Sequence, residues 1–380
     1  MRARSASGVL AVAVCTAAMV SLVSAQGASV GNREDGKRLF ERETFGGNGR
    51  TCATCHTAET GTVSPADAQR RLQADPSDPL FVHDGSDDGL GHGVARMLTD
   101  ATVLINIPMA ANVSLAGRSA RTVTLRRGIP TTLNTPALDR VLMLDGRQPT
   151  LEAQALGALH DHAQNTQTPT AKDLERIKDF QLTDAFFSSP ALRNFARGGA
   201  APTLPQGTTA SEKRGRRFFE DVPPDPTDGF RPGLCAHCHS GPLMNQTNRF
   251  APNFIGLPIP TGTRFQNVLV SFFNQANNPV NEFVFNKGTA GEVHVLSPDA
   301  GRALITGVVD DGTNSSMEAF KISPLRGVRR TAPYFHDNSA KTLEDVAKHY
   351  TRFFNFVTGG LIQLTPQDEA DLVAFMKLLD

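Results

Sequence analysis

Two stretches of the sequence decide the fold: CATCH at residues 52–56 and CAHCH at residues 235–239. Both have the spacing C-x-x-C-H, which is the attachment signature of a c-type haem. In such a site two thiols bind one haem covalently, and the histidine that follows lies under the iron. Because the chain has only 5 cysteines and 10 histidines, two chance copies are not expected. We expect two haem c groups, attached at Cys52, Cys55, Cys235 and Cys238, with His56 and His239 as iron ligands.

Other uses of paired cysteines fit this spacing less well. Zinc ribbons usually separate their cysteine pairs by about 15–20 residues, whereas here the gap runs from Cys55 to Cys235. Zinc would also not require a histidine after each pair, and a thioredoxin-like redox pair would not occur twice. Zinc and disulfides are therefore disfavoured.

The approach to each site repeats as well. GKRLFE at residues 36–41 precedes the first site and GRRFFE at residues 215–220 precedes the second. Each segment is typical of a short amphipathic helix that leads into a loop. We therefore predict a mainly α protein of two tandem cytochrome-c-like haem domains, with long loops and a few short strands. The predicted domains are 26–197 and 208–380, joined by a Gly/Pro-rich linker over 198–207.

Length, charge and the N-terminus narrow the class further. The chain has 380 residues with 38 basic and 38 acidic side chains, which excludes a basic nucleic-acid-binding protein. Residues 1–25 carry Arg2 and Arg4, then an apolar stretch, and end in a plausible cleavage site. This pattern predicts a signal peptide, export to the periplasm and no membrane span after its removal. The alternative is a membrane anchor, for which the stretch is short.

Helical signals dominate the rest of the chain. Thr170, Thr342 and Thr365 each precede an aspartate by three residues, which is typical of a helix N-terminus. We predict helices after each of them and a hairpin within 268–285, where residues are β-branched and aromatic. Residues 57–127 are predicted to be rich in loops.

Four further segments carry a family resemblance. They are RGIPTTLN at 127–134, LDGR at 144–147 followed by LEAQA at 151–155, FKISPLR at 320–326 and TAPYFHD at 331–337. With the two C-x-x-C-H motifs, they make the chain resemble the bacterial dihaem cytochrome c peroxidase and MauG family. The resemblance covers most of the mature chain, except roughly 57–120 and 262–292.

The resemblance implies a periplasmic dihaem oxidoreductase. In the family the N-terminal haem reacts with hydrogen peroxide or oxygen, and the low-spin C-terminal haem passes electrons. Three functions stay open: a peroxidase supplied by a small donor such as a cytochrome c or a cupredoxin, a MauG-like oxidase of a protein or organic substrate, and a non-enzymatic electron carrier. A homodimer is compatible with the family layout.

The resemblance also assigns residues around the C-terminal haem. The family's sixth iron ligand lies fourteen residues after the histidine of TAPYFHD, which places it at Tyr350 here. That ligand is Met in the peroxidases and Tyr in MauG. An ordinary buried tyrosine is the alternative, and His349 is the runner-up ligand. His336, within the motif, is expected beside the second haem.

Calcium usually sits between the family's domains. Its backbone ligands correspond to Thr331 and Pro333, whereas the family's asparagine ligand is replaced by Gly128 or Ile129. Calcium accepts carbonyl and water oxygens, so the resemblance still implies a weakened site.

Two departures from the family affect the chemistry. The tryptophan between the haems is Leu144, and the chain has no tryptophan at all. At the position of the family's catalytic glutamate this chain has Gln164, whose amide cannot accept the first proton of peroxide. His160 would share the face of Gln164 if the segment were helical, so His160 or His162 is a candidate replacement base, with a surface or structural role as the alternative.

Three more histidines lie close to the two motifs in sequence. His83 and His92 follow the first site, and either could cap the N-terminal iron, although an open or water-bound iron is preferred. His237 is expected to face solvent or a haem propionate.

Overall fold

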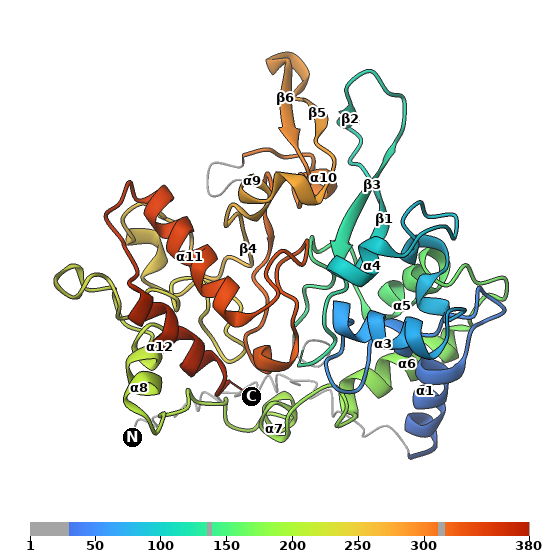
Figure 1. Cartoon of the computed structure of the whole chain (residues 1–380), viewed down its shortest axis with the longest axis horizontal. Coiled ribbons are helices and arrows are strands. Elements are labelled where there is room, and N and C mark those ends of the chain that lie inside the picture. Colours follow the sequence, from blue (N-terminus) through green and yellow to red (C-terminus); the bar gives the residue numbers. More distant parts are fainter. Residues whose placement is uncertain (1–29, 135–138, 311–315, 380) are drawn as a thin grey trace, which may run out of the picture.

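The computed structural model describes residues 30–134, 139–310 and 316–379. The chain is mainly helical with a few short strands and long connections, as the sequence predicts (Figure 1). The elements before the linker are α1 (Val30–Arg42), α2 (Cys52–Cys55), α3 (Pro65–Ala74), α4 (Ala95–Asp100), β1 (Thr102–Pro108), β2 (Val113–Leu115), β3 (Thr122–Gly128), α5 (Leu151–Asp161), α6 (Ala171–Thr183) and α7 (Pro190–Ala196).

The elements after the linker begin with α8 and end with α12. They are α8 (Ala210–Arg217), β4 (Phe265–Gln266), α9 (Val270–Phe273), β5 (Asn281–Asn286), β6 (Glu292–Ser297), α10 (Ala303–Thr306), β7 (Phe320–Lys321), α11 (Leu343–Val357) and α12 (Pro366–Met376). Residues 198–207, the predicted linker, form irregular backbone between α7 and α8.

Three predicted helix starts are confirmed by their capping boxes. Thr170, Thr342 and Thr365 each accept a hydrogen bond from the backbone N–H three residues on, and the aspartate there bonds back. The local sequence thus satisfies the first exposed N–H groups of α6, α11 and α12 without tertiary help.

The repeated approach segments form the same helix crossing in both halves. A Cβ atom at Gly36 would lie 2.2 Å from the carbonyl oxygen of Arg176, and one at Gly215 would lie 2.0 Å from that of Asp371. Each glycine therefore lets two helices approach at backbone distance, α1 against α6 and α8 against α12.

An aromatic pair seals each crossing. Phe40 lies four residues after the first glycine and packs on Phe180, with ring centroids 5.6 Å apart. Phe219 lies four residues after the second glycine and packs on Phe375 at 5.3 Å. The two halves therefore share one scaffold, built from the same short sequence pattern.

The strands differ from the prediction. Residues 57–127 include a regular hairpin, in which β1 pairs antiparallel with β3. The hairpin expected within 268–285 lies further along, because β5 pairs with β6, while residues 270–273 form the short helix α9. Alternation along one strand does not identify its partner, so the sequence placed the pair too early.

A third apolar core joins the two halves. Strand β2 pairs with β5, and a buried cluster combines Ile107 and Leu125 with Phe283 and Leu304. Residues 281–309 thus pack on the strands of the N-terminal half, a contact that the two-domain division at the linker does not express (Figure 1).

No helix in the described part of the chain is long and apolar enough to cross a membrane. The predicted signal peptide, residues 1–25, lies outside the described residues.

Candidate haem pockets

The first C-x-x-C-H lies on and just after α2. Cys52 and Cys55 bound this one-turn helix and are not paired in a disulfide. Both thiols line a cavity together with His56. The His56 Nδ1 lies 2.8 Å from the carbonyl oxygen of Gly61. Because a carbonyl only accepts, Nδ1 carries the proton and Nε2 is left with its lone pair.

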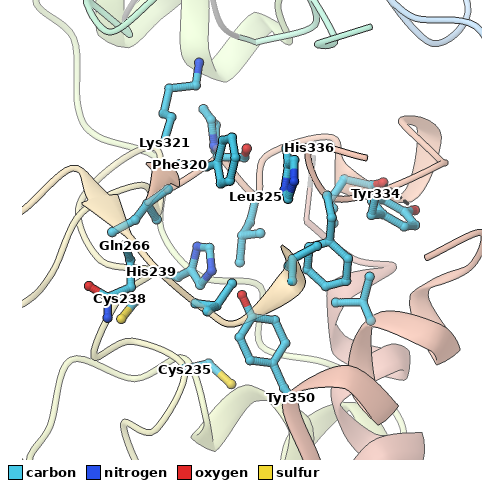
Figure 2. Close-up of a pocket in the computed structure, with 18 of the residues that line it drawn as sticks. Cys235, Cys238, His239, Gln266, Phe320, Lys321, Leu325, Tyr334, His336 and Tyr350 are labelled. Atoms are coloured by element: carbon cyan, nitrogen blue, oxygen red, sulfur yellow. Dashed lines mark hydrogen bonds between the residues drawn. The ribbon is translucent and has the colours of Figure 1, made fainter. Parts of the chain in front are cut away.

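The second site repeats this arrangement in detail. Cys235 and Cys238 are also unpaired and line a second cavity with His239 (Figure 2). His239 Nδ1 lies 2.9 Å from the carbonyl oxygen of Met244, which again is five residues further on. Two motifs 183 residues apart therefore fix the same imidazole tautomer by the same local bond.

Burial sets the protonation state of these groups. It raises the pKa of Cys52 and of Cys238 to about 12, and it lowers the pKa of both His56 and His239. Neutral thiols and neutral imidazoles therefore face the two cavities. This donor set fits a haem, since a neutral imidazole with Nδ1 engaged is the form that binds iron through Nε2.

The wall opposite His239 is largely apolar and carries Tyr350. This residue comes from α11, whose Leu343, Val346 and Phe353 line the same cavity. Figure 2 shows the Tyr350 hydroxyl directed toward the space that His239 also faces. These side chains therefore share one face of α11, and the phenol oxygen lies within the pocket.

The runner-up ligand His349 lies elsewhere. Its Nε2 is 2.9 Å from the carbonyl oxygen of Val268, and its ring packs against Phe335. It is not among the residues lining the cavity. The alternative ligand is thus contradicted by the position of this side chain one residue around the helix.

His336 lies at the C-terminal cavity, as expected. Its ring stacks on Phe320 with centroids 3.7 Å apart and an interplanar angle of 8°. Its Nε2 lies 3.3 Å from Ser271 Oγ. The histidine is thereby fixed as a flat side wall rather than as a ligand pointing at the centre.

Of the residues expected around calcium, the structure brings the two backbone positions and Gly128 to the C-terminal cavity. Thr331 and Pro333 line the C-terminal cavity. A side chain at Gly128 would meet Asn338, whose Oδ1 lies 2.1 Å from the place of its Cβ, and Gly128 N–H donates to the His336 carbonyl oxygen. Within the described ranges no group of three or more His, Cys, Asp or Glu side chains is arranged to hold a metal.

Helix α5 lines the N-terminal cavity together with His56, but Gln164 and His160 do not share a face of this helix. The helix ends at Asp161, so Gln164 does not continue it; its φ is 51° and its Oε1 accepts from Asn48 Nδ2 at 3.1 Å. The His160 side chain is 81% exposed and pairs with Asp161. Neither Gln164 nor His160 lines the cavity.

His162, in contrast, lines the N-terminal cavity with His56. It caps the C-terminus of α5, and its Nδ1 lies 2.5 Å from Asp84 Oδ2. The other oxygen of Asp84 accepts a hydrogen bond from Arg50 Nη1. A histidine, a carboxylate and a guanidinium therefore form one continuous chain beside this cavity.

The less favoured alternative, in which His83 or His92 caps the N-terminal iron, is not supported by the positions of these side chains. His92 is exposed and pairs with Asp88 at 2.7 Å. His83 does not line the cavity either. Neither is placed to cap the N-terminal iron.

His237 does not face solvent, although it does line the C-terminal cavity. It is buried, its Nε2 lies 3.0 Å from the carbonyl oxygen of Leu257, and its ring packs on Phe254. The residue between the two cysteines thus serves the core, because the loop at 254–257 folds back over it.

One thin wall separates the two cavities. Ile129, Pro130, Thr131 and the buried Lys321 line both of them. Lys321 Nζ lies 3.4 Å from Asp139 Oδ2. Leu144, in the place of the family tryptophan, lines the C-terminal cavity next to this wall.

Sequence reasoning missed Asp84, Arg50 and Lys321. Asp84 lies 78 residues before His162, and no local spacing connects them. Lys321 was visible within FKISPLR, but nothing in that motif indicates that its side chain faces both cavities.

Comparison with known proteins agrees with this geometry. Residues 33–198 match a family model described as di-haem cytochrome c peroxidase. A segment of 87 residues is 36% identical to the cytochrome c551 peroxidase of Nitrosomonas europaea, and it spans only 22% of each chain.

One solved structure supports the same fold, and a second aligns less closely. A crystal structure of a MauG-like protein associated with microbial copper homeostasis aligns with a TM-score of 0.50 at 20% identity, over 94% of this chain and 91% of that chain. The diheme peroxidase BthA from Burkholderia thailandensis aligns with a TM-score of 0.48 at 16% identity, over 92% and 86% of the two chains.

Proposed function

The chain belongs to the di-haem cytochrome c peroxidase and MauG family, and from this premise we propose that it is a periplasmic dihaem c-type peroxidase. Hydrogen peroxide is reduced at the N-terminal haem, and the electrons arrive through the C-terminal haem. A small reduced electron-transfer protein, a cytochrome c or a cupredoxin, supplies them. Each peroxide takes two electrons and two protons and gives two waters.

The residues of this chain hold the two cofactors. Cys52 and Cys55 would hold one haem through thioether bonds to its two vinyl groups, and Cys235 and Cys238 would hold the other in the same way. His56 and His239 would bind the irons through Nε2. When bound, the haem supplies the redox chemistry.

The observation that carries the proposal is the inequality of the opposite walls. His162 lines the N-terminal cavity with an imidazole whose Nδ1 is engaged. Its Nε2 is suited to take a proton from one oxygen of peroxide and pass it to the other, which leaves as water. The C-terminal cavity offers the Tyr350 hydroxyl, which is suited to be a sixth ligand of a haem that only transfers electrons.

Tyr350 also favours a second candidate, a MauG-like oxidase of a protein or organic substrate. An oxygen ligand stabilises ferric and more oxidised iron better than the Met of the peroxidases. Leu144 counts against this candidate, because it removes an aromatic side chain from the wall between the cavities.

Steady-state turnover separates the candidates. The purified holoprotein is mixed with peroxide and a reduced small cytochrome c, and donor oxidation is followed. The peroxidase oxidises two equivalents of a one-electron donor per peroxide, whereas a carrier leaves peroxide unconsumed. Peroxide consumption that requires an added organic or protein substrate, and not the donor, would favour the oxidase.

A further inference from the structure

The His162 imidazole is held from behind by two buried charges. Asp84 is 4% exposed and Arg50 is 2% exposed. Asp84 Oδ2 accepts a hydrogen bond from Nδ1 of His162, and Asp84 Oδ1 accepts one from Nη1 of Arg50. Nη1 of Arg50 also lies 3.3 Å from the carbonyl oxygen of His162 itself. The histidine is therefore fixed at both its side chain and its backbone.

The loop before Asp84 is built around the guanidinium. Arg50 donates to three carbonyl oxygens of this loop: Pro79 at 2.7 Å, Leu80 at 2.9 Å and Val82 at 2.6 Å. A Cβ at Gly85 would lie 1.9 Å from the Leu80 oxygen and 2.5 Å from Arg50 Nη2. Only a residue without a side chain lets the loop close this tightly. The guanidinium is therefore held by the loop carbonyl groups as well as by the carboxylate of Asp84.

The carboxylate decides the tautomer of His162. Burial alone would raise the pKa of Asp84, but the hydrogen bonds from His162 and Arg50 and the charge of Arg50 outweigh it and lower that pKa. An ionised carboxylate only accepts hydrogen bonds, so the proton of neutral His162 lies on Nδ1. No residue in the described ranges hydrogen-bonds to Nε2, which is the nitrogen left for a molecule in the cavity.

We infer that Asp84 and Arg50 are positioning residues that orient the His162 imidazole as the base of the N-terminal cavity. This inference rests on the proposed function and names how its proton transfer is achieved. The unit replaces the family's glutamate with a histidine two residues before Gln164, held by side chains from an earlier part of the chain, while Gln164 itself accepts a hydrogen bond from Asn48. An oriented histidine backed by a carboxylate is a common way to keep one imidazole tautomer at a reaction site.

A purely structural role is the competing explanation. The same contacts would tie the 79–85 loop to the end of α5 whether or not a proton moves. The two explanations differ in what happens to a proton-coupled event in the cavity when the fold is kept. Binding of hydrogen cyanide to ferric haem is such an event, because the acid must lose its proton as the anion binds.

The experiment measures the cyanide association rate at the N-terminal haem of the holoprotein by absorption. We expect His162→Gln, which keeps the Asp84–Arg50 pair, to slow association by about 10²–10⁴-fold, the size of a base's contribution. Asp84→Asn should slow it by roughly 10- to 100-fold, as for other supporting partners of a reactive histidine. In the His162→Gln background, Asp84→Asn should cause no further slowing.

The matched control is Asp88→Asn. Asp88 belongs to the same loop and also pairs with a histidine, His92, but on the surface. It should leave the cyanide rate unchanged. Thermal unfolding and haem content of each variant establish that the fold persists. If Asp84→Asn fails to fold, Asp84→Glu is measured in its place; because it keeps the carboxylate, it should slow cyanide binding less than His162→Gln does.

Turnover distinguishes the inference from the proposed function. Peroxide turnover should show kcat falling with the cyanide rate while KM changes little. A cyanide rate unaffected by His162→Gln, or equal additive losses in the double variant, would overturn the inference even if peroxide is reduced. Slowed cyanide binding without any peroxide reduction would instead overturn the proposed function alone.

Discussion

The two haem pockets are alike on the histidine side and unlike on the opposite side. His56 and His239 each engage a carbonyl oxygen five residues further on, and each pocket rests on a glycine helix crossing. The N-terminal cavity is also lined by His162, which is backed by buried charges, whereas the C-terminal cavity is lined by Tyr350 in a largely apolar wall. The shared half binds a cofactor, and the differing half decides what each cofactor does.

Removal of the thiols should break the comparison most completely. Cys52→Ala with Cys55→Ala should halve the covalent haem content and abolish peroxide reduction. Cys235→Ala with Cys238→Ala should also halve the haem content but remove the low-spin signal. Haem staining after denaturing electrophoresis and absorption spectra provide the measurement. Full haem retention in either double variant would contradict the attachment assignment.

Exchange of the sixth ligand should alter only the C-terminal pocket. A tyrosine oxygen stabilises ferric iron, whereas a methionine raises the reduction potential. We expect Tyr350→Met to raise the potential of one haem and shift its spectrum, with the other haem unchanged. Spectroelectrochemical titration measures both. An unaltered potential and spectrum would show that Tyr350 is an ordinary buried side chain.

The helix crossings should respond equally in the two halves. Gly36→Ala and Gly215→Ala each place a Cβ against a carbonyl oxygen. Helices forced apart in this way typically cost about 1–3 kcal/mol. Denaturant unfolding of the two variants should give similar losses, with Gly157→Ala in α5 as a control, since its added Cβ would meet only the end of the Gln148 side chain. A loss in only one variant would argue against a common scaffold.

Acid should lower the unfolding free energy through the N-terminal pocket by less than the glycine substitutions do. The pKa of Asp84 is lowered in the folded chain, so its stabilising contribution is complete above the unfolded pKa of about 3.9 and is lost as pH falls through the folded value. The difference in unfolding free energy between the wild type and Asp84→Asn should therefore shrink below about pH 4. A difference that stays constant from neutral to acid pH would contradict this sign.

Local patterns in the sequence predicted local structure well. The capping boxes at Thr170, Thr342 and Thr365 place three helices, because the bonds they form lie within one turn. The β2–β5 pairing joins residues about 170 positions apart and depends on which faces meet in space. No periodicity in either strand carries that information.

The candidate site shows the same limit. The C-x-x-C-H motifs were found because their spacing is local, and Tyr350 was assigned because the resemblance places the family's sixth ligand fourteen residues after the histidine of TAPYFHD. The base was narrowed to His160 or His162, but the end of α5 at Asp161 decides between them, and helix ends are poorly fixed by sequence. Asp84 reaches His162 through a loop closed around Arg50, which depends on tertiary packing.

Spectra of the ferric holoprotein before and after cyanide test the central claim most directly, since they count open and closed irons. The inequality of the pockets predicts one high-spin haem that becomes low-spin with cyanide, and one low-spin haem that does not respond. The responsive signal should vanish in the Cys52→Ala, Cys55→Ala variant. Two low-spin haems that both ignore cyanide, or a responsive signal that survives in that variant, would contradict the account.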